Sequence, residues 1–136
     1  MKKFLILAVA ALAMVGCAIE DTPVVSFSQE SYTVSSQGGE LIIPVSSTGV
    51  DDVIITYQHS DDAWEYDQST GDMTPTGGWI KVVKVIKNYE QTRELAKWTS
   101  GIYLQIEPNT SDRERVGYVT VRSFMAEDKV TIKQGF

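Results

Sequence analysis

The sequence predicts an all-β protein, an immunoglobulin-like antiparallel β-sandwich of about seven or eight strands. Three observations lead to this fold class. Beyond Pro23, apolar and polar residues mostly alternate, which is the pattern of strands with one buried face. The alternating runs are short and are separated by turn residues, among them Gly38-Gly39 and residues 74–78. A stretch of roughly 110 residues with this organisation has the size of one sandwich domain.

The first half of the domain contains five expected strands, each marked by apolar residues at every second position. These residues are, in chain order, Val25 and Phe27; Tyr32 and Val34; Leu41, Ile43 and Val45; Val53, Ile55 and Tyr57; and Trp64 and Tyr66. The third of these runs includes Pro44, which has no amide hydrogen to donate. We therefore expect this strand to lie at a sheet edge or to carry a bulge at the proline.

The second half begins with an irregular strand. Residues 79–86 are mainly apolar, but Lys81, Lys84 and Lys87 are spaced by three, which predicts a strand with a phase slip at a bulge. Residues 89–98 are the only segment whose composition favours a helix. The remaining expected strands are marked by Ile102, Leu104 and Ile106, by Val119 and Val121, and by Val130 and Ile132.

The N-terminal segment predicts secretion and a lipid anchor. Two lysines precede an apolar run, residues 4–15, that is too short to span a bilayer. The sequence Met14-Val15-Gly16-Cys17-Ala18 resembles the lipobox of bacterial lipoproteins, whose cysteine receives fatty acids such as palmitate and becomes the new N-terminus. A signal peptide with an incidental cysteine is the alternative. We expect residues 1–16 to be a signal peptide, residues 17–23 a lipid-anchored tether and residues 24–136 the folded domain.

The charge of the chain argues against a nucleic-acid partner. The formal net charge is −6, and no Lys or Arg lies between Cys17 and Ile80. Because nucleic-acid binding depends on neutralising phosphates, a chain with no basic stretch is poorly suited to it. The uneven charge indicates a soluble domain with a dipolar surface, with a charge-steered partner as the alternative.

Several short motifs follow one another in the order of a known family. They are the pair Gly38-Gly39 before a strand, Trp64, the pair Trp79-Ile80, the segment from Asn109 to Arg115, and Ile132-Lys133-Gln134 in the last strand. This pattern resembles the BACON domain (Bacteroidetes-associated carbohydrate-binding often N-terminal) over roughly residues 24–134. The resemblance implies an immunoglobulin-like sandwich that accompanies glycan-degrading enzymes on cell-surface lipoproteins. Residues 84–100 depart from the pattern and look like an insertion.

The resemblance also implies a location. Ala18 after Cys17 is not the aspartate that is associated with inner-membrane retention, and Glu20-Asp21 resembles the acidic patch of surface-exported lipoproteins in that phylum. We therefore expect an outer-membrane lipoprotein that is anchored through Cys17 and faces outward.

No catalytic or cofactor-binding pattern is visible. The single histidine, His59, lies beside Ser60 and Asp61, but a catalytic triad needs convergence in space and not adjacency in sequence. Zinc is not expected with one histidine and a cysteine that is committed to lipid. A glycosidase would need two carboxylates about 5–9 Å apart in a cleft, which the sequence cannot show. We expect a protein that is not an enzyme and that needs no cofactor.

One run of carboxylates leaves a metal site open. Five acids lie within residues 61–72, and Asp61, Asp62 and Asp67 are the candidate ligands for calcium. The spacing matches no calcium-binding loop, and solvated loop acids are the alternative.

The candidate carbohydrate-binding residues are Trp98, Tyr89 and Trp64, whose rings could stack on sugars. Trp98 and Tyr89 lie in the inserted segment, where the alternative is that Leu95 and Trp98 pin the insertion onto the sandwich. Trp64 and Trp79 stand at family positions, where the alternative is a place in the core. The sequence thus predicts an outer-membrane-anchored, non-catalytic lipoprotein that binds a polysaccharide or host glycan. A structural spacer or assembly subunit of a cell-surface protein complex is the alternative.

Overall fold

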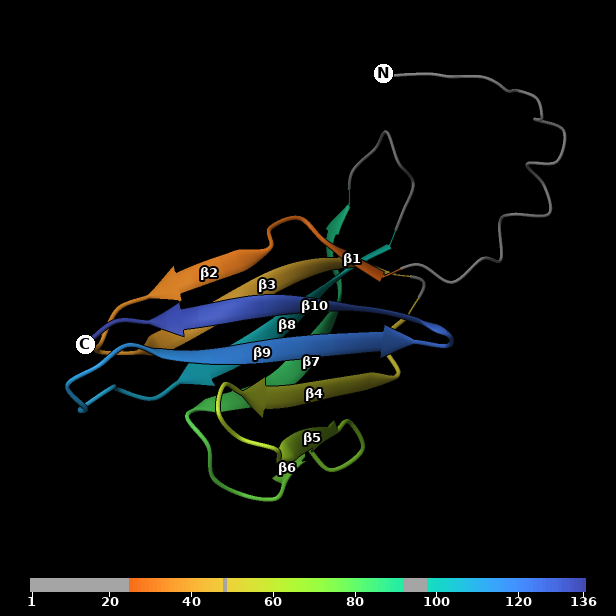
Figure 1. The fold of residues 1–136 in the computed structure, drawn as a ribbon. Coiled ribbons are helices and arrows are strands. Elements are labelled where there is room, and N and C mark those ends of the chain that lie inside the picture. The colour runs from red at the N-terminus through yellow and green to blue at the C-terminus, as the bar shows by residue number, and fades with distance from the viewer. Residues whose placement is uncertain (1–24, 48, 92–97) are drawn as a thin grey trace, which may run out of the picture.

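The computed structural model describes residues 25–47, 49–91 and 98–136, which form ten strands in two facing sheets (Figure 1). The four-stranded sheet has the order β1 (Val25–Phe27), β3 (Gly39–Ser47), β8 (Trp98–Ile106) and β7 (Ile80–Gln91). The six-stranded sheet has the order β2 (Ser31–Val34), β10 (Ala126–Gln134), β9 (Arg115–Ser123), β4 (Asp52–Tyr57), β5 (Ala63–Asp67) and β6 (Asp72–Thr74).

This strand order is that of a variable-type immunoglobulin domain. The four-stranded sheet corresponds to strands A, B, E and D, and β10, β9, β4, β5 and β6 correspond to G, F, C, C′ and C″. The predicted fold class is therefore confirmed. Two details differ from the prediction of seven or eight antiparallel strands. The described residues form ten strands, and β2 pairs with β10 in parallel.

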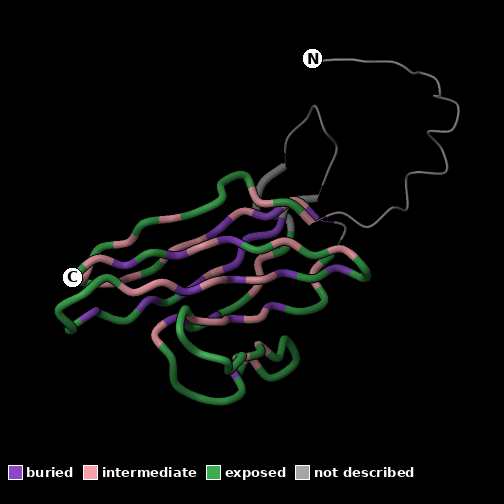
Figure 2. The backbone as a smooth tube through the Cα atoms, in the orientation of Figure 1, coloured by how far each residue is buried: buried purple, intermediate pink, exposed green. Residues whose placement is uncertain are grey.

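The core lies between the inner faces of the two sheets. Buried and exposed residues alternate along most strands, as Figure 2 shows, so that each strand contributes every second side chain. The buried apolar residues are Ile43, Val45, Val53, Ile55, Met73, Ile80, Val82, Ile102, Leu104, Ile106, Val119, Val121, Val130 and Ile132. Burial of each such aliphatic side chain contributes about 1.5–3 kcal/mol, so this layer is the main source of stability.

The predicted phase slip in the strand after residue 79 is confirmed. The pairing of β7 with β8 shifts register between Val82 and Lys84, which leaves Val83 as the extra residue of a bulge. The shift keeps Lys84 exposed and turns Val85 toward the core. Without it, the charged side chain would point between the sheets.

The expectation for Pro44 also agrees with the structure. β3 lies between β1 and β8, but β1 pairs only with residues 45–47. Among the described strands, Pro44 pairs with Gly101 of β8 alone, so the proline lies where β3 is still a sheet edge.

The composition of residues 89–98 favours a helix, but the described residues of this segment form strands. Residues 89–91 belong to β7 and Trp98 begins β8, and Gln91 pairs with Trp98. Residues 92–97 lie outside the described residues. Pairing along a long β-hairpin outweighs the weak helix preference of a few residues.

We predict that Gly38→Ala destabilises the protein by about 3 kcal/mol. Gly38 has φ +74°, and an added Cβ would collide with the carbonyl oxygen of Ile106 and lie 2.9 Å from the carbonyl carbon of Glu107. Gly71→Ala is the matched control, because Gly71 has φ +81° but nothing within 4 Å of an added Cβ. The control isolates the backbone strain and should cost about 1 kcal/mol. Urea unfolding measures both, and equal losses would contradict the collision.

Candidate functional site

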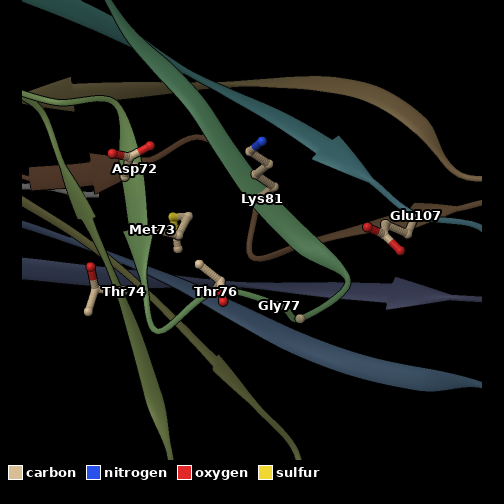
Figure 3. Close-up of a pocket in the computed structure, with 8 residues that line it drawn as sticks. Asp72, Met73, Thr74, Thr76, Gly77, Lys81 and Glu107 are labelled. Atoms are coloured by element: carbon tan, nitrogen blue, oxygen red, sulfur yellow. The ribbon is translucent and has the colours of Figure 1, made fainter.

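A cleft of about 620 Å³ lies where the last strand of one sheet faces the last strand of the other. Its lining residues are Asp72, Met73, Thr74, Thr76, Gly77, Gly78, Lys81 and Glu107 (Figure 3). They come from β6, from the loop that leads to β7, from β7 itself and from the residue after β8. The cleft exists because β6 and β7 are both edge strands, so that the sandwich is open between them.

The sequence pattern did not predict β6, which forms one wall of the cleft. Three-residue β6 carries a single buried apolar residue, Met73, which is too little alternation to mark a strand. β6 forms because it pairs with β5, with Glu65 opposite Thr74 and Tyr66 opposite Met73. The Tyr66 hydroxyl then donates a hydrogen bond to the Val83 carbonyl of β7 at 3.1 Å, which ties the two sheets together.

The loop between β6 and β7 is shaped by two glycines. Gly77 and Gly78 have φ +103° and +89°, a region that other residues rarely adopt. Gly78 also has no room for a side chain, because an added Cβ would lie 2.5 Å from the Tyr57 hydroxyl. The turn residues that the sequence marked as a break at 74–78 therefore form the mouth of the cleft.

An aromatic cluster supports this loop from inside. The Tyr57 hydroxyl accepts a hydrogen bond from the Ile80 amide at 3.0 Å, and burial raises the pKa of this hydroxyl. The Trp79 ring lies 5.4 Å from the Tyr57 ring between centroids, and the Arg115 guanidinium lies 4.5 Å from the Trp79 ring centroid. Trp79 is thus held in the partly buried layer against the core and is not a free platform for a sugar.

A buried polar network closes the same end of the sandwich. Gln134 is fully buried, and its side-chain amide donates to the carbonyls of Ser35 at 3.0 Å and Glu107 at 2.8 Å. Its side-chain carbonyl accepts a hydrogen bond from Arg115 Nε at 2.7 Å. Asn109, also buried, donates to the carbonyls of Arg113 and Gly135. Asn109, Arg115 and Gln134, which belong to the motifs that resemble the BACON pattern, therefore have a structural role at this end.

These contacts fix the backbone of Glu107 and leave its side chain exposed. The Glu107 amide donates to the Trp79 carbonyl at 2.9 Å, and the Glu107 carbonyl accepts from Gln134 and from Arg115. Asp72 and Lys81 are exposed as well. The cleft thus offers two carboxylates, one ammonium group and the hydroxyls of two threonines to a polar ligand.

A second hollow of about 440 Å³ lies beside β5 and β6 and shares Thr74 with the first. It is lined by Asp51, Asp52, Glu65, Tyr66, Asp67, Gln68, Ser69 and Thr74. Hydrogen bonds from the Ser69 hydroxyl and amide, at 2.6 and 2.8 Å, lower the pKa of the Asp67 carboxyl. Within the described ranges, no group of three His, Cys, Asp or Glu side chains is placed to hold a metal ion.

The structure does not bring the three candidate calcium ligands together. Asp61 and Asp62 lie in the loop before β5, whereas Asp67 is the last residue of that strand. β5 itself is roughly 13 Å long from Ala63 to Asp67, because each of its four steps adds about 3.3 Å, so the strand keeps these two places apart. Asp67 also uses one carboxylate oxygen to accept bonds from Ser69. The spacing in sequence could not show that the strand intervenes.

Trp64 lies against the core and not on an open surface. It pairs with Ile55 across β4 and β5, is partly buried, and meets the Tyr57 ring edge-on at a centroid distance of 4.8 Å. Its indole Nε1 is buried without a hydrogen-bond partner among the described residues. The core alternative therefore describes Trp64 better than the sugar-binding role.

The other two predicted carbohydrate-binding residues are only partly visible. Tyr89 is in β7 and Trp98 begins β8, so both lie in the β7–β8 hairpin. Their side chains are outside what the structure describes, and so is Cys17. In the part of the chain that is described, no helix is long and apolar enough to cross a membrane.

Comparison with known proteins gives matches in structure alone. No protein-family model matches the chain, and no curated protein matches it. A Bacteroides ovatus GH5 xyloglucanase in complex with a XXXG heptasaccharide is similar at 14% identity and a TM-score of 0.46, over 85% of this chain. The chain spans only 19% of the length of that enzyme.

Two further solved structures are similar over most of their own length. One is a protein from Bacteroides thetaiotaomicron, at 14% identity and a TM-score of 0.44, over 85% of this chain and 92% of that one. The other is titin domain M7, at 17% identity and a TM-score of 0.43, over 83% of this chain and 91% of that one. At these identities and TM-scores, the three likenesses give no information about a ligand or an activity.

We predict that Gln134→Ala lowers the free energy of unfolding by about 2–3 kcal/mol, because it removes three hydrogen bonds in a buried place. Lys133→Ala is the control, because Lys133 is exposed on the same strand and should change stability by no more than about 0.5 kcal/mol. Urea denaturation followed by tryptophan fluorescence measures both variants. A Gln134→Ala midpoint equal to that of the control would show that the network does not hold this end together.

Proposed function

We propose that this chain is a glycan-binding module without catalysis, held at the outer membrane through Cys17, and that the cleft between β6 and β7 is its binding site. The observation that carries the proposal is the cleft itself, with carboxylates, an ammonium group and hydroxyls on its walls. Its volume of about 620 Å³ lies within the range of roughly 300–1,000 Å³ that is usual for ligand sites.

The lining suits a ligand that is rich in hydroxyl groups. Carboxylates of Asp72 and Glu107 accept hydrogen bonds from sugar hydroxyls, and Lys81 donates to sugar oxygens. Thr74 and Thr76 can do either. Bonds to charged groups are about twice as strong as neutral ones, so the two carboxylates should contribute most to affinity.

The exposure of the cleft acids favours binding over hydrolysis. A glycosidase needs one carboxyl group in apolar surroundings that keep it protonated as the acid. Asp72 and Glu107 are both exposed, so neither has such surroundings. The family resemblance of the sequence, which implies a companion of glycan-degrading enzymes, agrees with a binding role.

Part of the cleft lies far from the end of the sandwich where the described chain begins. β1, the first described strand, starts beside Ser47 at one end of the sandwich. Gly77, Gly78 and Glu107 lie at the other end, where β7 begins opposite the end of β8. A chain anchored before β1 would therefore present these three residues away from the membrane, whereas Asp72, opposite Asp67, lies nearer the anchored end.

We predict that the full chain, solubilised in detergent, binds a subset of sugars on an array of host, plant and microbial glycans. Asp72→Asn and Glu107→Gln should each weaken binding roughly tenfold, which corresponds to about 1.4 kcal/mol, because each removes one charge-assisted hydrogen bond. Titration of the best array ligand by calorimetry gives the affinities. Asp112→Asn is the control, since its side chain is 92% exposed and lies outside the cleft.

The outcomes separate the candidate sites and functions. Trp98→Ala belongs in the same series, and binding lost in that variant alone would move the site to the β7–β8 hairpin. Equal affinity in all variants and in the control would remove the cleft from consideration. Absence of binding across the array would reject the glycan proposal and favour a spacer or assembly subunit.

A further inference from the structure

Two large apolar side chains lie exposed at the tip of the hairpin that joins β9 to β10. Ser123 pairs with Ala126, so Phe124 and Met125 form a two-residue turn, which we call the hairpin tip. Phe124 is 77% exposed and Met125 is 87% exposed. Large apolar side chains that are exposed together mark contact surfaces for partners or membranes.

Neither burial nor turn geometry explains the phenylalanine. Phe124 has φ +58°, and glycine is the residue that suits a positive φ at the first position of a two-residue hairpin turn. The Phe124 amide donates to a carboxylate oxygen of Asp51, which holds the turn against the loop between β3 and β4. The backbone of the hairpin tip is thus fixed to the sandwich while its side chains extend into solvent.

The hairpin tip lies at the end of the sandwich where the described chain begins. Val25 pairs with Ser47, and the Phe27 amide donates to Asp128 at 3.3 Å, so β1 starts beside the beginning of β10. In Figure 1, the start of β1 and the β9–β10 turn lie at one end of the molecule, and the C-terminus lies at the other. This end is opposite to the mouth of the proposed glycan cleft.

The length of chain before β1 limits how far this end can be from an anchor. Cys17 precedes Val25 by eight residues, which span at most about 28 Å when fully extended. A strand of nine residues, such as β9, is itself about 30 Å long. A lipid on Cys17 therefore keeps the start of β1 within about 28 Å of the bilayer, which lets the hairpin tip reach the membrane surface.

We propose that the hairpin tip inserts into the interfacial layer of the bilayer that carries the lipid anchor. The inference rests on the anchor at Cys17 that is part of the proposed function. Phe124 and Met125 supply apolar surface for a second membrane contact, as an anchored protein gains from two membrane-binding elements. The contact would fix the orientation of the sandwich, so that the mouth of the glycan cleft points away from the membrane.

The charged groups around the hairpin tip are compatible with a zwitterionic surface. Glu127 is paired with Arg122 at 3.1 Å, and Asp51 accepts the bond from the Phe124 amide. Asp128 accepts bonds from the amides of Phe27 and Lys129. Each of these carboxylates accepts a hydrogen bond or forms an ion pair, and basic residues are not in excess around the hairpin tip. Anionic headgroups would therefore not attract it.

We predict that a fluorescent probe at the hairpin tip senses the bilayer. The full lipidated chain is reconstituted into phosphatidylcholine vesicles after labelling of a Met125→Cys variant with an environment-sensitive dye. Cys17 is the only native cysteine, and acylation blocks its thiol, so the dye reports one position. Phe136→Cys is the control, because this residue is 72% exposed at the C-terminus, at the opposite end.

We expect the emission of the dye at position 125 to be blue-shifted. Lipids that carry a shallow spin label should quench the dye at position 125 at least threefold more than the dye at position 136. Phe124→Gly in the Met125→Cys background keeps the turn and should reduce this quenching by about half. Equal quenching at the two positions would overturn the contact, and so would a blue shift without quenching, which would indicate contact between proteins.

The anchor is measured independently in the same samples. The intact mass of the mature chain and its recovery with the vesicles report acylation of Cys17. An acylated chain whose probe at position 125 remains water-exposed would overturn the membrane contact and leave the anchor in place. A chain with a free Cys17 thiol that does not float with the vesicles would overturn both.

Discussion

The burial of two facing aliphatic layers without a disulfide is the constraint on which the rest of this structure depends. Most inner positions of the central strands must carry an apolar side chain in the correct phase, because a one-residue slip would turn the whole set toward solvent. The bulge at Val83 satisfies this constraint, since it keeps Lys84 outside and returns Val85 to the core. The same constraint leaves the outer faces and edges free for function.

A polar network then shapes one end of the sandwich. Gln134 connects β10 to the carbonyls of Ser35 and Glu107, while Arg115 bonds Gln134 and covers Trp79. Buried polar groups are costly unless they are fully paired, so such a network specifies one arrangement. As a result the backbone of Glu107 is held at the mouth of the cleft, although its side chain is exposed. Structural residues thereby position the candidate binding residues.

The two ends of the sandwich carry different features, and the proposed function assigns a different role to each. One end carries the start of β1 and the exposed Phe124 and Met125, and the other carries the mouth of the cleft. In the proposed function, an anchor before β1 would leave the opposite end of the sandwich available to a glycan.

The sequence by itself determined the sandwich, because alternation such as that of Val119, Thr120 and Val121 follows from one buried face per strand. It also determined the bulge in β7, since the lysine spacing interrupts that alternation. Only the tertiary structure decided the site: β6 exists through pairing with β5, and Lys81 of β7 and Glu107, which follows β8, line the same cleft. It also separated Asp67 from Asp61 and placed Trp64 against the core, because distance in space depends on the intervening strand and not on spacing in the chain.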